Sequence, residues 1–431
     1  MNIYQELKER GFCYQQTDEE AIEKLLTTEQ VRFYVGFDPT GNSLHVGHLL
    51  PVMAMRLLQK AGHIPIVLVG GATAQIGDPS GRISARPMMT LETIAENVRC
   101  LRAQLRRFID DTDGKALFVN NADWLCKIGY IEMLREVGSI FSVNRMLAQE
   151  SVKSRLENGL SFLEFNYSIL QGYDFYILNR DYGCKLEMGG QDQWGNMVAG
   201  TELVRRKSGN EVHCMTIPLL MNSSGQKFGK TSGGANVWLD VNRTSVFDYY
   251  QFWRNSDDAQ VEKLLLYFSA LPIDEVKRLC DPAGNINRAK EILAYEATCL
   301  AHGEAAAREA FVTAGSRFGF ADPERKIPTT SSILSVEPVR IAAELPVAEI
   351  DPAELAAPEG VTVARLLVLA GLCKSNSDGR RLIQGGAVSI DDRKITDPVA
   401  AVRSADFGEN GLVLRAGKKN FRRAVLKQQE G

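Results

Sequence analysis

Two histidines, His45 and His48, stand three residues apart in the segment YVGFDPTGNSLHVGH. The segment runs from an apolar stretch through a Gly/Pro turn into a predicted helix, whose free N–H groups and positive dipole end suit a phosphate. There the two imidazoles and Thr40 could donate hydrogen bonds to phosphate oxygens, while Gly36 and Gly47 leave room for a nucleotide. An ordinary turn with surface histidines remains an alternative. A metal site is another, although no Cys, Asp or Glu stands beside the histidines at ligand spacing.

The motif KFGKT carries a second group of polar side chains, Lys227, Lys230 and Thr231, within the Gly- and Ser-rich run NSSGQKFGKTSGG. This composition predicts a loop. Two lysines on such a loop can close on a triphosphate and stabilise the charge of a departing pyrophosphate. The spacing is not that of a Walker A motif, since Ser224 stands where that motif needs a glycine. For the motif alone, a solvated linker is the alternative.

Two further segments place polar groups at informative spacing. In YSILQGYDF, Tyr167, Gln171 and Asp174 stand at i, i+4 and i+7, which puts all three on one face of a helix. An amphipathic helix that turns Tyr and Leu into a core is the alternative. In GGQDQWGN, Asp192 and Gln193 follow a glycine pair. That segment fits a ligand site or a turn in which Asp caps a helix.

HVGH at the first predicted strand–helix junction, with KFGKT roughly 180 residues later, resembles the class I aminoacyl-tRNA synthetases, whose signatures are usually written HIGH and KMSKS. These segments, together with GATAQIGDPSGR, are more closely similar to the bacterial tyrosyl-tRNA synthetases over nearly the whole chain. The resemblance implies activation of L-tyrosine with ATP to tyrosyl-adenylate plus pyrophosphate, then transfer to the 3′-terminal adenosine of tRNA(Tyr). ATP is then a substrate accompanied by Mg²⁺, no metal is tightly bound by the protein, and the chain forms a homodimer.

The resemblance also implies roles for individual residues. Tyr34 and Asp174 match the donor and acceptor for the phenol of the substrate. Such a pair should reject phenylalanine, because both polar groups would lose their partners. The other matching residues are Asp78, Tyr167, Gln171 and Gln193 for the amino and carboxylate groups of tyrosine, Gly36, Asp38, Gly47, Asp192 and Lys230 for ATP, and Thr40, His45, His48, Arg82, Arg86, Lys227, Lys230 and Thr231 for the reacting phosphates and pyrophosphate.

The chain departs from the family pattern at three positions near this pocket. Glu187 and Gln191 stand where Gln and Ser are expected, so the hydrogen bonds behind the pocket should differ. Val35 stands where some relatives carry Cys. Two other functions remain open from the residues: a nucleotidyltransferase that makes the adenylate of a different acid, and an RNA-binding protein that has lost catalysis.

A doubly wound, Rossmann-like α/β domain is the predicted scaffold for these side chains. Apolar runs in VRFYVGFD, IPIVLVGGATA, KALFVNN and HCMTIPLLM alternate with helical patterns that begin near His45 and Leu91. We expect a catalytic domain over 1–220 with a helical insertion at about 125–180, the KFGKT loop and a helical domain over 221–345, a linker over 346–360, and a small α+β domain over 361–431.

The C-terminal segment is a basic module in an otherwise acidic chain. From Val361 onward there are 13 Lys+Arg and 7 Asp+Glu, whereas the remaining residues hold 37 and 46. The pattern predicts two helices, the second capped near Ser377 or Asp378, followed by a hairpin, and it resembles an S4-type RNA-binding domain. The residues expected to face tRNA phosphates are Arg380, Arg381, Lys418, Lys419, Arg422 and Arg423. A solvated basic face is the alternative.

The composition is that of a globular protein, with 45% hydrophobic and 24% charged residues in 431. The polar, acidic start lacks the pattern of a secretory or transit peptide, and no apolar run reaches the length of a membrane span. Eight cysteines are scattered without a CxxC pair, as in a reducing compartment. We therefore expect a cytoplasmic protein with no membrane partner.

Overall fold

The structure, a computed structural model, shows the chain as two compact units. The first comprises Met1–Ser245 and Asp257–Lys277, and the second Val246–Ser256 and Arg278–Gly431. The described residues are 1–80, 88–156, 159–221, 228–229, 235–339, 345–357, 359–391, 393–408, 410–417 and 420–427.

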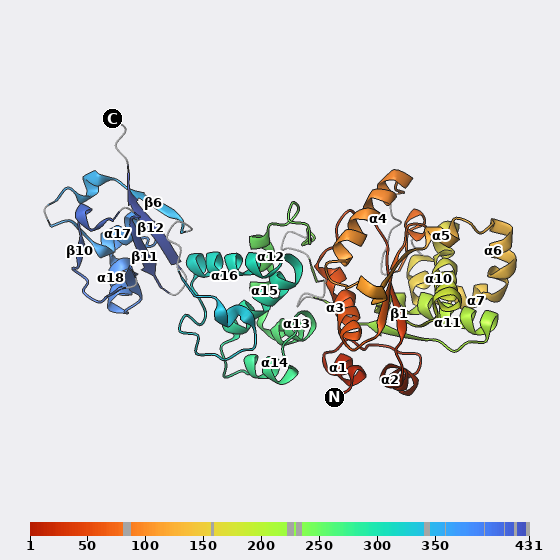
Figure 1. The fold of residues 1–431 in the computed structure, drawn as a ribbon. Helices are drawn as coiled ribbons and strands as arrows, with labels where there is room; N and C mark the ends of the chain where they lie inside the picture. The colour runs from red at the N-terminus through yellow and green to blue at the C-terminus, as the bar shows by residue number, and fades with distance from the viewer. Residues whose placement is uncertain are drawn as a thin grey trace. The chain divides into compact units, whose positions relative to one another are not determined.

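A five-stranded parallel sheet forms the centre of the first unit, in the order β3-β2-β1-β4-β5. Its strands are β1 (Arg32–Phe37), β2 (Ile64–Val69), β3 (Leu117–Asn120), β4 (Cys184–Gly190) and β5 (His213–Ile217). Helices α3 (Val46–Lys60) and α4 (Leu91–Leu105) lie on one face of the sheet, and α10 (Tyr167–Tyr182) and α11 (Trp194–Ser208) lie on the other (Figure 1). The predicted doubly wound α/β domain is thereby confirmed.

Strand β4 is the one central strand that the apolar pattern missed. Its sequence, CKLEMGG, contains a lysine, a glutamate and two glycines, so it does not read as a buried strand. In the fold it lies between β1 and β5, and Glu187 is directed into the protein with only 2% of its surface exposed. Glu187, whose charge makes this segment look unlike a buried strand, is therefore itself buried.

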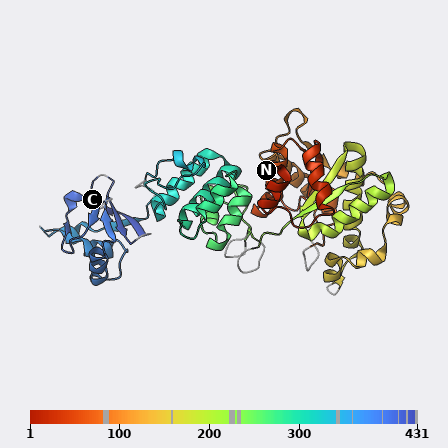
Figure 2. The ribbon, with the colours of Figure 1, turned by 90° about the horizontal axis from the view of Figure 1, so that it is seen from below.

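Short helices complete the first unit. The N-terminal pair, α1 (Ile3–Glu9) and α2 (Glu19–Thr28), lie beside each other (Figures 1 and 2). The region expected to hold a helical insertion contains α5 (Ala122–Leu125), α6 (Tyr130–Glu136), α7 (Val143–Leu147), α8 (Glu150–Leu156) and α9 (Phe162–Phe165) before α10. Helix α13 (Val261–Phe268) also belongs to this unit, and α14 (Ile273–Leu279) crosses its boundary.

The second unit begins with packed helices, α12 (Val246–Arg254), α15 (Ile286–His302) and α16 (Glu304–Phe318). A buried ion cluster ties them: Glu291 accepts from Arg254 and from Arg288, each at 3.2 Å. Because the helical segments 246–256 and 257–277 fall in different units, the single helical domain expected over 221–345 does not match the packing of the chain.

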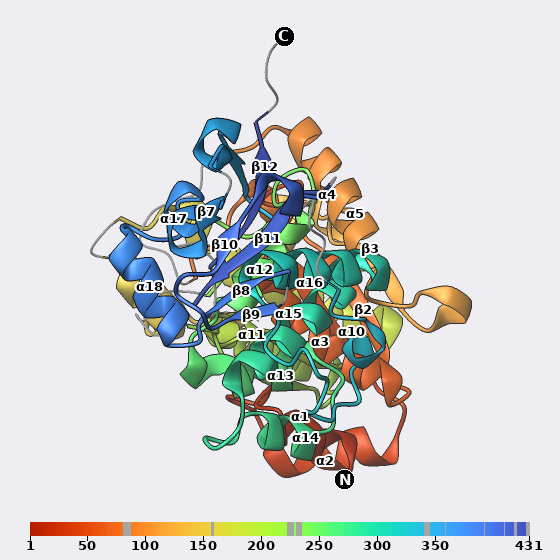
Figure 3. The ribbon, with the colours of Figure 1, turned by 90° about the vertical axis from the view of Figure 1, so that its left-hand side faces the viewer.

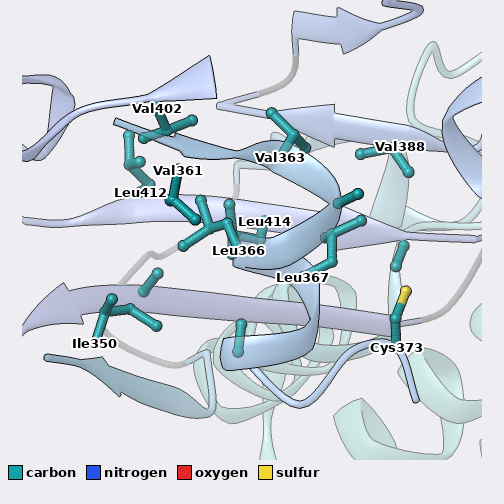
Figure 4. Close-up of a cluster of buried hydrophobic side chains, with 14 of the residues drawn as sticks. Ile350, Val361, Val363, Leu366, Leu367, Cys373, Val388, Val402, Leu412 and Leu414 are labelled. Carbon is teal, nitrogen blue, oxygen red and sulfur yellow. The ribbon is translucent and has the colours of Figure 1, made fainter. Parts of the chain in front are cut away.

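The C-terminal part of the second unit is a second sheet, ordered β6-β12-β11-β8-β9, with two helices beside it (Figure 3). Its elements are β6 (Val347–Ile350), β7 (Val361–Thr362), α17 (Val363–Leu369), α18 (Asn376–Gln384), β8 (Val388–Ile390), β9 (Arg393–Ile395), β10 (Ala401–Val402), β11 (Leu412–Ala416) and β12 (Asn420–Leu426). Figure 4 shows the core, where Leu366 and Leu367 of α17 lie among strand residues such as Leu414.

Two expectations for this part were wrong in detail. The stretch 346–360 is not a linker, because β6 pairs in parallel with β12 and Ile350 and Leu355 are buried in the core. The N-cap of α18 is Ser375, whose side chain accepts from the N–H of Asp378, and not Ser377 or Asp378 itself. All four residues from Ser375 to Asp378 have cap-forming side chains, so the sequence leaves the start of the helix open.

Candidate active site

The two histidines cap helix α3 with their ring nitrogens. Nδ1 of His45 accepts from the N–H of Gly47 at 3.1 Å, and Nδ1 of His48 accepts from the N–H of His45 at 3.1 Å. The two rings lie 3.9 Å apart between centroids. Because each Nδ1 is an acceptor, the neutral imidazole carries its proton on Nε2. Each histidine is therefore prepared to donate a hydrogen bond from Nε2.

Two residues of the predicted KFGKT loop region, Gly229 and Val237, lie against the start of helix α3. A Cβ added to Gly229 would lie 3.3 Å from the backbone nitrogen of Gly47. Val237 donates its N–H to the carbonyl of Gly229 at 2.9 Å and accepts from the N–H of Val46 at 3.0 Å. The structure thus brings Gly229 of KFGKT to the HVGH segment. The predicted phosphate ligands Arg82, Arg86, Lys227, Lys230 and Thr231 lie outside the described residues.

Gln191, one of the departures from the family pattern, holds the chain that leads into this loop. Its Oε1 accepts from the N–H of Leu219 at 3.0 Å. Leu220 in turn accepts from the N–H of Phe228 at 2.7 Å. The longer side chain of Gln191 therefore contributes to anchoring the start of the loop.

The two residues predicted to select the phenol, Tyr34 and Asp174, are both buried, at 1% and 2% exposure. Asp174 Oδ1 accepts from Trp124 Nε1 at 2.7 Å, and Oδ2 accepts from Asn121 Nδ2 at 2.9 Å. The hydroxyl of Tyr34 has no hydrogen-bond partner among the described residues. A buried hydroxyl without a partner costs free energy unless a ligand satisfies it.

A line of hydrogen bonds runs from Asp174 to the predicted ammonium site. Asn121 Nδ2 also donates to Thr73 Oγ1 at 3.0 Å. Thr73 donates to Asp38 Oδ1 at 2.7 Å, and the hydroxyl of Tyr167 donates to Asp38 Oδ2 at 2.8 Å. Asp38, predicted as an ATP ligand, therefore also orients Tyr167.

Asp78 and Gln193 form a second polar group. Gln193 Nε2 donates to Asp78 Oδ2 at 2.7 Å, and the N–H of Ser80 donates to Asp78 Oδ1 at 2.9 Å. Asn196 donates to Gln193 Oε1 at 3.2 Å and fixes the amide. Burial raises the pKa of Tyr167 most, and the charges of Asp38 and then Asp78 raise it further, so Tyr167 and Asp78, which we expected beside the ammonium, lie near each other.

Gln171, on the same helix face as Tyr167 and Asp174, reaches across to the sheet. Its Nε2 donates to Glu187 Oε1 at 2.9 Å. The amide oxygen of Gln171 is then the end left for a ligand N–H. All three groups of the predicted stripe therefore make hydrogen bonds inside the protein, Tyr167 with Asp38, Gln171 with Glu187 and Asp174 with Asn121 and Trp124.

Close packing at a glycine supports this arrangement. A Cβ on Gly70 would lie 2.1 Å from Asp38 Oδ1 and 2.3 Å from Thr73 Oγ1, so only glycine fits there. A Cβ on Gly36 would meet only Leu68, at an ordinary 3.8 Å. Nothing in the described protein requires the glycine at position 36, which is consistent with space kept for a ligand.

Burial dominates the electrostatics of the pocket. It raises the pKa of Asp78 to about 6, of Glu187 to about 7 and of Asp174 to about 8, although hydrogen bonds to each carboxylate oppose the shift. The pKa values of Tyr34 and Tyr167 are raised well above the usual range, first by burial and then by neighbouring carboxylates. The three carboxyl groups are therefore partly protonated near neutral pH. A cationic ligand group would be favoured there, because it stabilises their ionised forms.

Several network residues were missed by sequence reasoning: Thr73, Asn121, Trp124 and Asn196. Asn121 directly follows β3, and Thr73 lies four residues after the end of β2. The carboxyl ends of parallel strands are where ligand groups collect. That signal could have found them. Nothing in the sequence marks Trp124 as the donor to Asp174.

The remaining predicted residues are placed as follows. Thr40 is exposed, and its N–H donates to the carbonyl of Asp38 at 2.8 Å. Asp192 lies beside Gly190, where an added Cβ would be 2.6 Å from its Oδ1. In the second unit, Arg380 and Arg381 are exposed on α18, and Lys418 and Lys419 lie outside the described residues.

Across the described ranges of the chain, no group of three or more His, Cys, Asp or Glu side chains is placed to hold a metal ion. Within the same ranges, no helix combines the length and apolar character needed to cross a membrane.

Two family models match the chain. Residues 26–319 match the tRNA synthetases class I (W and Y), and residues 342–424 match the tyrosine–tRNA ligase SYY-like C-terminal domain. The tyrosine–tRNA ligase of Clostridium botulinum (strain Eklund 17B / Type B) is 49% identical over 426 residues, which cover 99% of each chain. That of Clostridium perfringens (strain 13 / Type A) is 48% identical over 426 residues with the same coverage.

Solved structures give the same picture. A C-terminally truncated mitochondrial tyrosyl-tRNA synthetase of Aspergillus nidulans matches with a TM-score of 0.64 and 30% identity, covering 72% of this chain and 92% of that one. The tyrosyl-tRNA synthetase of Archaeoglobus fulgidus, complexed with L-tyrosine, matches with a TM-score of 0.56, covering 72% of this chain and 100% of that one. At 20% identity the second match shows the fold alone.

Proposed function

Because the chain belongs to the tyrosine–tRNA ligases of the class I tRNA synthetases (W and Y), we propose how its own residues divide that reaction. The enzyme activates L-tyrosine with ATP to tyrosyl-adenylate plus pyrophosphate and transfers the tyrosyl group to tRNA(Tyr). The observation that carries the residue assignment is the buried pair of Tyr34 and Asp174. Among the described residues the Tyr34 hydroxyl has no hydrogen-bond partner, and the nearby Asp174 carboxylate accepts from two N–H donors.

This pair binds the phenol of the substrate. The hydroxyl of Tyr34 donates to the phenol oxygen, and the phenol O–H donates to Asp174, whose oxygens can each accept a second hydrogen bond. Trp124 and Asn121 fix the carboxylate before the substrate arrives. Phenylalanine would leave the hydroxyl and the carboxylate without these partners, so its binding is disfavoured.

The amino group of tyrosine lies among Tyr167, Gln171 and Asp78. The hydroxyl hydrogen of Tyr167 is used on Asp38 and the amide hydrogens of Gln171 on Glu187, which leaves an acceptor oxygen on each. The ammonium also stabilises the ionised form of Asp78. Gln193, which donates to Asp78, lies near the carboxylate of the substrate.

ATP binds at the start of α3. His45 and His48 donate from Nε2 to the phosphates, together with Thr40, while Gly36 and Gly47 let the nucleotide approach the backbone. Asp192 accepts from the ribose. The loop residues Lys227, Lys230 and Thr231, with Arg82 and Arg86, complete the phosphate site.

The chemical step needs no nucleophile from the protein. The carboxylate of tyrosine attacks the α-phosphate, and the barrier falls because two anions are aligned and the transition-state charge is stabilised. Mg²⁺ would be held through phosphate oxygens and water.

The C-terminal domain binds tRNA through its basic side chains. Arg380 and Arg381 are exposed on α18, as phosphate contacts require; Lys418, Lys419, Arg422 and Arg423 are the other candidates. Replacing both arginines of α18 with alanine should raise the KM for tRNA and reduce the salt dependence of binding by about one unit for each lost phosphate contact. ATP–pyrophosphate exchange should stay unchanged, and a loss of exchange would contradict the assignment.

The chain forms a homodimer through the helical block between β3 and β4. Large apolar side chains are exposed on consecutive helices there: Tyr130, Ile131, Leu134, Val143, Leu147, Leu156, Phe162 and Leu163. Exposed apolar patches of this kind mark interfaces. Ile131→Asp, at a residue 73% exposed, should yield monomers in analytical ultracentrifugation, while Val399→Asp, at 71%, should not.

Two broader assignments are also proposed. The reaction takes place in the cytoplasm, a reducing compartment that suits eight cysteines present as free thiols. The chain divides into a catalytic domain, a helical domain and an RNA-binding domain, and the last of these includes β6 rather than beginning at residue 361.

ATP–pyrophosphate exchange measured with each of the twenty amino acids tests the pocket assignment. Tyrosine alone should give signal, and equal activity with phenylalanine would refute the role of the pair. Asp174→Asn should lower kcat/KM for tyrosine by at least about a hundredfold, because the Trp124 and Asn121 donors lose a charged partner. Its KM for ATP should change little. Asp181→Asn, an exposed position on the same helix, is the matched control.

A further inference from the structure

Glu187 lies directly beside Tyr34 in the central sheet. The two residues are paired across β1 and β4, so their side chains leave the sheet on the same face. Glu187 pairs in turn with Cys214 on β5, while Tyr34 pairs with Ile66 on β2. In this row of neighbours, Glu187 is the one carboxyl group.

Among the described residues, one of the two carboxyl oxygens of Glu187 has no hydrogen-bond partner. Oε1 accepts from Gln171 Nε2 at 2.9 Å. Oε2 is buried, and neither it nor the hydroxyl of Tyr34 has a partner that meets hydrogen-bond geometry among the described residues. The two unpaired atoms belong to paired residues on neighbouring strands, and Glu187 is close enough to shift the pKa of Tyr34.

The surroundings of Glu187 favour its neutral form. Within the described residues no salt bridge reaches it, and burial raises its pKa to about 7, although the nearby Tyr34 hydroxyl and the hydrogen bond from Gln171 oppose the shift. The titratable groups that face it are Tyr34 on β1, Asp174 on α10, Cys184 on β4 itself and Cys214 on β5.

Three of these neighbours, Tyr34 and the two thiols, stay neutral near pH 7, and Asp174 titrates in the same range as Glu187. Burial raises the pKa of both thiols far above neutrality. Asp174 titrates together with Glu187, so the pair is best treated as one coupled unit. Asp174 accepts from two N–H donors and Glu187 from one, and donors stabilise the charged form. Even so, burial raises the pKa of Asp174 to about 8 and that of Glu187 to about 7, so both groups are partly protonated near neutral pH.

We propose that Glu187 is a positioning residue for tyrosine selection: as a neutral acid it donates from Oε2 to the hydroxyl oxygen of Tyr34 and so directs the Tyr34 hydrogen toward the phenol of the substrate. A hydroxyl that accepts from one side donates to the other. Ionised Glu187 instead accepts the Tyr34 hydrogen and withdraws it from the phenol. The inference rests on the proposed phenol-binding role of Tyr34.

The test compares Glu187→Gln with the wild-type enzyme by tyrosine-dependent ATP–pyrophosphate exchange between pH 6.5 and 9. Glutamine can accept from Gln171 and donate to Tyr34 at every pH, so it imitates the neutral acid. The wild-type KM for tyrosine should rise relative to that of the variant as pH increases. With half the acid protonated at pH 7 and about one hundredth at pH 9, the ratio should change by up to about 50-fold. The ratio cancels the titration of free tyrosine.

The decisive comparison repeats Glu187→Gln in an enzyme that also carries Tyr34→Phe. If Glu187 acts through the Tyr34 hydroxyl, Glu187→Gln should no longer alter the pH profile once that hydroxyl is gone. A profile that differs equally in both backgrounds, or a wild-type profile that matches Glu187→Gln at all pH values, would overturn the inference. The wild-type enzyme offers a separate measurement, since the KM for phenylalanine should lack the step seen with tyrosine.

The same variants separate this inference from the phenol assignment. If Tyr34→Phe leaves discrimination against phenylalanine intact, the role of Tyr34 fails and Glu187 has nothing to position. If Tyr34→Phe loses discrimination but Glu187→Gln leaves the pH profile unchanged, only the role of Glu187 fails. The KM for ATP should stay constant throughout.

Discussion

Thr73→Val tests whether the line of hydrogen bonds behind the pocket matters for tyrosine. The change keeps the shape of a buried side chain and removes its hydroxyl, which donates to Asp38 at 2.7 Å and accepts from Asn121 at 3.0 Å. A hydrogen bond to a charged group contributes about 1.5–3 kcal/mol. Asn121 keeps its bond to Asp174, so the loss falls mainly on Asp38.

Two quantities should report this loss. The melting midpoint of the enzyme should fall by about 3–10 °C, from the stability lost per domain of this size. The kcat/KM for tyrosine should fall about tenfold, about 1.4 kcal/mol, because Asp38 then holds the Tyr167 hydroxyl beside the ammonium less firmly. The KM for ATP should change by less than about threefold.

Thr73→Ser is the matched control, since it keeps the hydroxyl and removes one methyl group. It should stay within about twofold of wild type in kcat/KM for tyrosine. If Thr73→Val behaves like Thr73→Ser, the hydrogen bonds seen between Thr73, Asp38 and Asn121 do not support substrate binding, and the network reasoning is wrong.

Two other predictions follow from the same pocket. Gly70→Ala should abolish most tyrosine activation, because its Cβ would lie 2.1 Å from an oxygen of Asp38, whereas Gly41→Ala, with nothing within 4 Å, should be silent in the same exchange assay. The raised pKa values of Asp78, Glu187 and Asp174 mean that the folded protein holds protons that the unfolded chain has released above pH 4–5. The melting midpoint of the free enzyme should therefore fall as pH rises from 5 to 8. Saturating L-tyrosine, whose ammonium stabilises carboxylates, should flatten that slope.

The sequence predicted those parts of the site that depend on local patterns. The polar stripe of Tyr167, Gln171 and Asp174 follows from helical periodicity, and all three side chains make hydrogen bonds with polar groups of other elements. The strands before HVGH and within KALFVNN follow from apolar runs bounded by turn residues. Such features need only the residues within one or two elements.

The missed features depend on pairing between distant segments. Asn121 and Thr73 are polar residues after two separate strands, and only the order of the sheet brings them into contact. The segment of β6 reads as a linker because its four residues, two of them exposed, show little apolar pattern. The strand that pairs with it, β12, lies about 75 residues later in the chain. Strand β4 is not recognisable in the sequence for another reason. Its buried Glu187 breaks the apolar pattern by which a buried strand is identified.

The network gives a physical reason why recognition at the two ends of tyrosine should be coupled. Asp174 at the phenol end and Asp38 beside the ammonium site are joined through Asn121 and Thr73 by consecutive hydrogen bonds of 2.9, 3.0 and 2.7 Å. A displacement of either carboxylate must therefore strain the hydrogen bonds that hold the other one. A ligand that lacks the phenol should bind its ammonium less well than the same ammonium contacts would predict. Mutations at the two ends should consequently be non-additive, as expected for residues within one network.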